Sequence, residues 1–98
     1  MTKDCGVSKT SKIIGSKWTI MILHQLCAGL KRFGELQRLL PGISPKTLSA
    51  RLKELEKHGV VSKKVFDEMP LRVEYSLTKK GESLKALISQ MEAWGKMA

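Results

Sequence analysis

Hydroxyl and basic side chains are concentrated in one central part of the chain, residues 44–64. This segment carries six basic and two acidic residues, and its first half holds two serines and a threonine. Such side chains donate hydrogen bonds to phosphate oxygens and base edges, and the cations release counterions when they bind a polyanion. The segment therefore favours noncovalent recognition of nucleic acid. The candidate DNA-binding residues are eight side chains of this segment and one arginine that follows it: Ser44, Lys46, Thr47, Ser49, Arg51, Lys53, Lys63, Lys64 and Arg72.

The formal net charge of +9 is distributed unevenly along the 98 residues. Residues 1–32 have a net charge of +5 and residues 44–64 of +4, whereas residues 65–98 carry equal numbers of basic and acidic side chains. A concentrated positive excess favours a polyanionic partner, here double-stranded DNA, over a generally basic surface. A solvated basic face without a ligand is the alternative interpretation.

Cys5 is the candidate redox sensor of the chain. It precedes a predicted helix and lies among Lys3, Lys9 and Lys12, an electropositive setting that favours the reactive thiolate form. A passive thiol in the N-terminal segment is the alternative. Cys27 lies on a predicted apolar helix, where a cysteine usually behaves as an inert core residue.

Catalytic and metal-binding patterns are missing from the sequence. The two cysteines and two histidines have no zinc-binding spacing, and we find no glycine-rich phosphate loop and no paired acid and base. We therefore predict no metal, no cofactor and no enzymatic activity. The longest apolar stretch, residues 18–23, is too short for a membrane span, and the N-terminus lacks the apolar core of a signal peptide. We expect a cytoplasmic protein that does not contact the membrane.

Two predicted helices precede the basic segment. The first covers residues 18–27, is apolar on most sides, as in a buried central helix, and ends at Gly29. The second covers residues 33–40 and is terminated by Pro41-Gly42.

The helix over residues 44–58 is the predicted recognition helix. It begins with Ser44-Pro45, an N-cap hydroxyl followed by proline at the first helical position. Three leucines at helical spacing define its buried face: Leu48, Leu52 and Leu55. Opposite that face lie Lys46, Ala50, Lys53 and Lys57, and on its flanks lie Thr47, Ser49 and Arg51. In helix-turn-helix proteins, residues near the start of the second helix meet the bases, so Arg51 is a candidate base reader.

Residues 60–77 form the predicted wing. Two β-rich runs, residues 60–66 and 72–77, are joined by a tip that contains proline. Lys63 and Lys64 on the first run are the predicted phosphate ligands of the wing.

Arg72, at the base of the second run, has two competing interpretations. It either reaches the DNA backbone or minor groove, or pairs with Asp67 or Glu68 of the tip. The acidic tip argues against deep insertion of the wing into DNA.

The last predicted helix, residues 79–95, carries an apolar stripe near a free C-terminus. Such a stripe either packs inside one subunit or forms a dimer interface, and we favour the interface because two-fold DNA sites favour dimers. Residues near the N-terminus are expected to pack against the same helix. The predicted interface consists of Val7, Ile13, Ile14, Leu84, Leu87, Ile88, Met91 and Trp94.

The order of these elements predicts the fold class. A helix pair with a tight turn followed by a hairpin is a winged helix-turn-helix, mostly α with a small β-hairpin (α+β). We expect a single DNA-binding domain over residues 1–98, with the N-terminal and C-terminal helices forming the dimer interface.

The sequence resembles the HxlR-type winged-helix regulators, which share their architecture with the MarR group. The segments that carry the resemblance are residues 14–19, 32–36, 40–48, 52–56 and 72–78. The resemblance implies a homodimer that uses its terminal helices and regulates nearby genes. In the family the cysteine at position 5 is usually followed by proline and in some members senses electrophiles or oxidants, whereas here Gly6 follows it.

The function predicted from these observations is that of a dimeric, sequence-specific DNA-binding transcriptional regulator that recognises a palindromic operator. A response to oxidants or electrophiles through Cys5 is a hypothesis attached to it. The alternative is a winged-helix module for protein–protein contact without specific DNA binding, which would not require the basic helix face.

Overall fold

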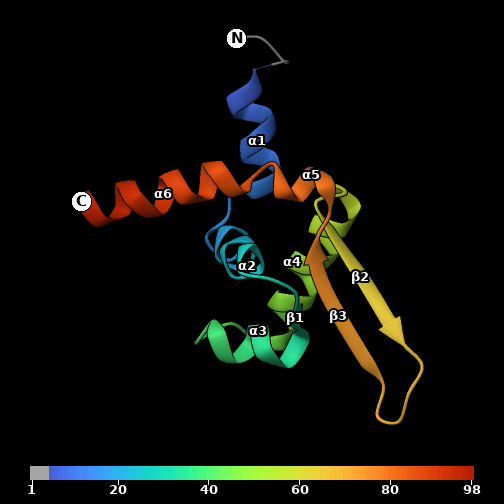
Figure 1. The fold of residues 1–98 in the computed structure, drawn as a ribbon. Coiled ribbons are helices and arrows are strands. Elements are labelled where there is room, and N and C mark those ends of the chain that lie inside the picture. Colours follow the sequence, from blue (N-terminus) through green and yellow to red (C-terminus); the bar gives the residue numbers. More distant parts are fainter. Residues whose placement is uncertain (1–4) are drawn as a thin grey trace.

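The computed structural model describes residues 5–98, so residues 1–4, including the Lys3 expected near Cys5, lie outside the description. The elements are α1 (Gly6–Ile14), α2 (Lys17–Cys27), β1 (Lys31–Arg32), α3 (Phe33–Leu39), α4 (Pro45–Lys57), β2 (Val61–Phe66), β3 (Arg72–Leu77), α5 (Lys79–Glu82) and α6 (Lys85–Met97). Figure 1 shows α2, α3 and α4 in the body of the molecule, with the β2–β3 hairpin, α1 and α6 projecting from it in different directions. The predicted fold class, mostly α with a small sheet, is confirmed.

Local capping interactions explain where the central helices begin. The Ser16 hydroxyl accepts a hydrogen bond from the Thr19 N–H at 3.2 Å, and the Ser44 hydroxyl accepts one from the Thr47 N–H at 3.0 Å. Such N-caps satisfy a free backbone donor and each contribute about 1 kcal/mol. Gly59 follows α4 with a φ of 72°, the left-handed conformation that glycine adopts most readily. The boundaries predicted for the recognition helix are therefore correct to within one residue.

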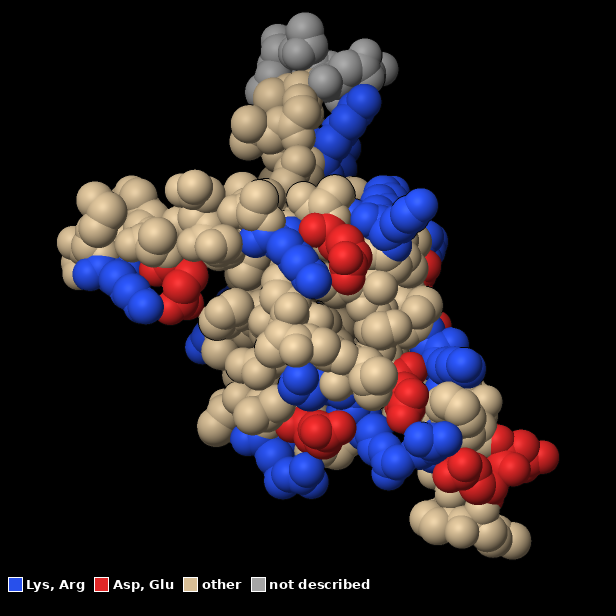
Figure 2. All heavy atoms as spheres, viewed as in Figure 1, with Lys and Arg blue, Asp and Glu red and all other residues tan. Residues whose placement is uncertain are grey.

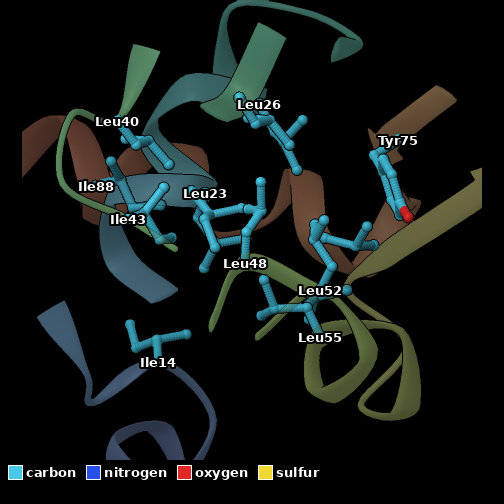
Figure 3. Packing of buried hydrophobic residues seen from close by; sticks show 14 residues of the cluster. Ile14, Leu23, Leu26, Leu40, Ile43, Leu48, Leu52, Leu55, Tyr75 and Ile88 are labelled. Carbon is cyan, nitrogen blue, oxygen red and sulfur yellow. The ribbon is translucent and has the colours of Figure 1, made fainter. Parts of the chain in front are cut away.

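A single core of leucine, isoleucine and valine side chains joins the helices to the sheet (Figure 3). Leu23 of α2 lies against the leucines of α4, and the Tyr75 ring of β3 packs at the edge of the cluster. The leucines at positions 48, 52 and 55 are at most 1% exposed, which confirms the predicted buried face of α4. This packing fixes which side of α4 points away from the protein.

The sheet has three strands, although the sequence predicts only a two-stranded hairpin. The strand order is β1-β3-β2, with Lys31 opposite Tyr75 and Arg32 opposite Glu74. β1 is only two residues long, which is too short to show an alternating pattern, and its partner lies far along the chain. The hairpin itself is in the expected place, with Val61 opposite Leu77 and Phe66 opposite Arg72.

The last predicted helix is interrupted, which corrects the continuous helix expected over residues 79–95. α5 packs so closely on the turn between α4 and β2 that a Cβ at Gly81 would collide with the Val60 carbonyl oxygen. The same carbonyl accepts a hydrogen bond from the Thr78 N–H at 3.1 Å. At Ser83 and Leu84 the N–H groups donate to carbonyls three residues back, so the chain tightens there before α6 begins.

Candidate nucleic-acid interface

The outer side of α4 is formed by Lys46, Ser49 and Lys53, all exposed, and we call this surface the α4 face. The two lysines form no hydrogen bond or ion pair with other residues of the described range 5–98. Opposite them the leucines hold α4 in the core, so the α4 face is presented on a rigid element. It can donate hydrogen bonds to phosphates or bases without first breaking an interaction within the protein.

The hydroxyls of Ser44 and Thr47 are already used at the start of α4. Ser44 donates to Thr47 Oγ1 at 2.9 Å while accepting from the Thr47 N–H. These two predicted DNA ligands therefore organise the N-terminus of the helix, where the helix dipole also favours a phosphate. Their direct contact with DNA stays a prediction.

Arg51 lies on a flank of α4 and is half-buried, whereas the lysines of the α4 face are exposed. Its side chain lines a hollow formed with the end of α1 and the start of α2. Within residues 5–98 its Nε is buried and has no hydrogen-bond partner. Arg51 thus faces a different direction from the α4 face.

The wing, defined as β2, β3 and the tip between them, presents its two predicted phosphate ligands on opposite sides. Lys63 and Lys64 are both exposed, and neighbouring residues of a strand project to opposite faces of the sheet. Lys64 has its Nζ 5.1 Å from the centre of the Phe66 ring. One flat DNA surface therefore cannot meet both lysines in the same way.

Arg72 is held within the wing. Its Nε is 3.2 Å from a Glu68 carboxylate oxygen, its Nη1 is 3.0 Å from Glu74 Oε2, and its guanidinium carbon is 3.8 Å from the centre of the Phe66 ring. The pairing with Glu68, weighed above as the alternative, is present, and Glu74 adds a second partner. A contact of Arg72 with DNA stays a prediction, and it requires these interactions to open.

Sequence reasoning missed two exposed arginines, Arg32 at the N-cap of α3 and Arg38 in its last turn. They line a hollow of about 410 Å³ together with Gly34 and Glu35. Figure 2 shows basic side chains in the lower part of the molecule, around α3 and β1 and along the wing. Because the first helix of a helix-turn-helix crosses the DNA backbone, a basic residue on that helix is the signal that could have found them.

Cys5 occupies the N-cap position of α1 and is half-buried, and its carbonyl oxygen accepts a hydrogen bond from the Lys9 N–H at 3.0 Å. Cys27 is also a free, half-buried thiol. Burial raises the pKa of Cys27, Lys85 lowers it and Glu82 raises it further. Cys27 is therefore kept mainly as the unreactive thiol at neutral pH.

The histidines contact single carboxylates. His24 Nε2 lies 3.6 Å from Glu92 Oε2, which links α2 to α6, and His58 Nε2 lies 3.8 Å from Glu54 Oε2 on α4. Over residues 5–98, no group of three or more His, Cys, Asp or Glu side chains is arranged to hold a metal ion. In the same range, no helix is both long and apolar enough to cross a bilayer.

The terminal helices carry a second, apolar surface. Val7 on α1 is 79% exposed, and Trp94 and Met97 on α6 are 69% and 81% exposed. An apolar groove of about 550 Å³ runs between α1, α2 and α6. Figure 2 shows few charged side chains along the upper side of α6. Such a concentration of exposed large apolar side chains is unusual for a free surface.

The eight predicted interface residues divide into two groups. Ile14 and Ile88 are 5% and 4% exposed and pack into the core of the subunit, so little of either side chain is left to contact a second copy. Ile14 is the buried residue of α1 and Ile88 that of α6, and both belong to the core shown in Figure 3. The residues that reach the surface wholly or partly are Val7, Ile13, Leu84, Leu87, Met91 and Trp94.

The three-helix core, the capped α4 and the β2–β3 wing define a winged helix-turn-helix protein. The chain belongs to the HxlR-like helix-turn-helix family, whose sequence pattern matches residues 13–98.

Individual relatives agree with this assignment. The chain is 44% identical over 92 residues to the HTH-type transcriptional regulator YkvN of Bacillus subtilis (strain 168), covering 94% of this chain and 78% of YkvN. Its fold matches that of a MarR-family transcriptional regulator from Porphyromonas gingivalis W83 with a TM-score of 0.94 and 41% identity, over 98% of this chain and 94% of the other. It also matches the oxidized form of the redox regulator HypR with a TM-score of 0.92 and 38% identity, over 96% and 97% of the two chains.

Proposed function

We propose that the protein is a dimeric, sequence-specific DNA-binding transcriptional regulator that acts in the cytoplasm as a single winged-helix domain over residues 1–98. The observation that carries this proposal is the α4 face, a set of exposed donors on a core-anchored helix whose two lysines have no partner within the described chain. Membership of the helix-turn-helix family supports the same function. No enzymatic activity, metal or cofactor is part of the proposal.

Dimerisation is supported by the apolar surface on α1 and α6. Burying Val7, Met91 and Trp94 against a second copy would remove large apolar area from water, which is the main driving force of association. A two-fold dimer presents two α4 helices and therefore reads a palindromic operator with two half-sites. A protein–protein module is the second candidate, but it gives no reason for the unpaired lysines of the α4 face.

The test of DNA binding is a titration of the DNA that flanks the gene with the full chain, followed by fluorescence anisotropy over a series of salt concentrations. We expect the logarithm of the binding constant to fall linearly with the logarithm of salt concentration, because phosphate contacts release counterions. An affinity independent of salt, or no affinity for any duplex, would contradict the proposal. A complex with one protein that survives nuclease and high salt would support the protein–protein module instead.

A redox response through Cys5 is the part of the proposal that concerns the signal. The similarity to a redox regulator supports it, and so does the place of Cys5 at the start of a helix close to Lys9. DNA binding measured before and after diamide should change in the wild type and stay unchanged in Cys5→Ser. An equal change in both proteins would exclude Cys5 as the sensor.

Cys27 supplies the internal control for that experiment. Because burial raises its pKa, its thiol should react with iodoacetamide at neutral pH more slowly in the folded protein than in the urea-unfolded chain. Mass spectrometry of the two peptides measures both rates. If Cys27 reacts as fast as in the unfolded chain, its thiol is not protected, and the comparison of the wild type with Cys5→Ser alone decides which cysteine responds.

A further inference from the structure

A hollow of about 300 Å³ lies between the end of α1, the start of α2 and the middle of α4, and we call it the α1–α4 hollow. It is separate from the α4 face, since its α4 residues are on the flank of the helix that carries Arg51. Segments far apart in the sequence meet here, namely Ser11 and Lys12, Ser16 and Thr19, and Arg51 and Glu54.

The cationic groups of the hollow have unused hydrogen-bonding capacity. Arg51 Nε is buried and has no hydrogen-bond partner among residues 5–98, and no ion pair of Arg51 or Lys12 is present in that range. A buried charged donor without a partner is costly, so a ligand that supplies an acceptor is favoured there. A guanidinium is the side chain that best matches the oxygens of a phosphate.

The neutral lining is also suited to an anion. Ser16 and Thr19 share a hydrogen bond of 2.7 Å between their hydroxyls at the N-terminus of α2. The positive end of this helix dipole and the hydroxyls add to the field of the two cations. The arrangement thus combines two cations, hydroxyl groups and a helix N-terminus around one hollow.

Among residues 5–98, Glu54 is the one acidic side chain that lines the hollow. It is 58% exposed, and its Oε2 lies 3.8 Å from His58 Nε2 rather than being paired with Arg51. Its charge opposes an anion in the hollow, so its removal provides a variant that should bind more tightly. That direction distinguishes a binding site from a merely structural cluster.

We propose that the α1–α4 hollow is an oxyanion site in which Arg51 and Lys12 bind a phosphate group. A backbone phosphate beside the major groove that α4 enters would provide it, and this source rests on the proposed function. A free phosphate-bearing small molecule offers the same chemistry. In either case Arg51 contacts a phosphate and does not read a base.

The first arm of the test titrates inorganic phosphate into the ¹⁵N-labelled full chain at constant ionic strength, with chloride as the balancing anion. Saturable shifts are expected at the Arg51 Nε–H and at the backbone amides of Ser16 and Thr19. In Arg51→Ala the two amides should no longer respond, and in Glu54→Gln saturation should occur at lower phosphate concentration. Thermal unfolding of each variant verifies that it is folded.

The second arm measures the affinity for operator and unrelated duplexes. A phosphate contact predicts that Arg51→Ala weakens both by the same factor, roughly tenfold, and lowers the magnitude of the salt slope by about 1. Arg51→Lys keeps the charge and should recover part of the loss. Lys79→Ala, an exposed lysine on α5, is the charge-matched control.

The results of the two arms show whether the bound phosphate belongs to DNA or to a free ligand, or they contradict the proposed oxyanion site. An equal loss on both duplexes assigns the phosphate to DNA, and saturable phosphate shifts with unchanged DNA affinity assign it to a free ligand. Loss on the operator alone identifies a base reader and overturns the proposal, as does the absence of both effects. If the wild type binds no DNA, the proposed function fails and the phosphate titration alone decides the fate of the site.

Discussion

Helix α4 and the wing both carry several basic side chains, but those side chains differ in whether they have partners within the protein. On α4, Lys46 and Lys53 project from a helix whose other side is buried, and they have no partner in the described chain. In the wing, Arg72 is held by Glu68 and Glu74 on top of the Phe66 ring. α4 carries four basic and two acidic side chains and the wing carries three of each, so the two regions differ in net charge as well as in how many of their cations are available.

The comparison shows what each region is built to do. Cross-strand pairs and ring contacts order the wing at the expense of its positive charge, whereas the leucines of α4 leave its cations free. A phosphate that approaches α4 displaces only water and counterions, but one that approaches Arg72 must compete with two carboxylates. We therefore expect α4 to provide most of the affinity for DNA and the wing to provide a smaller, adjustable part.

The largest difference is expected in stability. Leu52→Ala on α4 removes a side chain that is 1% exposed and should lower the free energy of unfolding by about 2–5 kcal/mol. Val65→Ala in the wing removes one that is 53% exposed and should change it by less than about 0.5 kcal/mol. Urea denaturation measures both. Equal losses would mean that the wing is as firmly anchored as α4.

A serine at the start of α4 and a serine in the wing allow a matched comparison with smaller expected changes in the free energy of unfolding. Ser44→Ala removes the N-cap and should cost about 1 kcal/mol of unfolding free energy. Ser62→Ala removes an exposed hydroxyl contact of 3.2 Å to Ser76 in the wing and should cost at most about 0.5 kcal/mol. The same denaturation experiment checks the pair, and a larger loss for Ser62→Ala would reverse the comparison.

The state of Arg72 can be changed directly. In the double variant Glu68→Gln/Glu74→Gln the guanidinium loses both charged partners, so affinity for any duplex should rise and the magnitude of the salt slope should increase by about 1. Fluorescence anisotropy over a salt series measures both quantities. Outside the wing, Glu82 is paired with Lys85, and Glu92 contacts His24 and Lys96, so Glu82→Gln/Glu92→Gln is the charge-matched control. An equal rise in that control would attribute the effect to net charge alone.

Features determined by local sequence could be predicted. Ser44-Pro45 and the three leucines that follow are enough to locate α4 and its buried face, because capping and helical spacing act within a few residues. The hairpin and the apolar stripe of the last helix follow from periodicity in the same way.

Features that depend on distant segments could not be predicted. Strand β1 exists because Lys31 and Arg32 pair with β3. The last helix is interrupted at Ser83 and Leu84, shortly after Gly81 packs on Val60. The α1–α4 hollow joins three elements, so nothing near Arg51 in the sequence indicates where its side chain points. The sequence left two partners possible for Arg72, namely DNA and an acidic residue of the wing tip. The Phe66 ring lies opposite Arg72 on the neighbouring strand and helps to hold its guanidinium within the wing.

The most direct test of the central claim compares the salt dependence of operator binding in two double variants. Lys46→Ala/Lys53→Ala removes two free cations of the α4 face and should lower the magnitude of the slope by about 2, with a large loss of affinity. Lys63→Ala/Lys64→Ala removes the same charge from the wing, but its lysines project to opposite faces, so the slope should fall by about 1 or less. Equal slopes for the two variants, or a larger fall for the wing, would contradict the account.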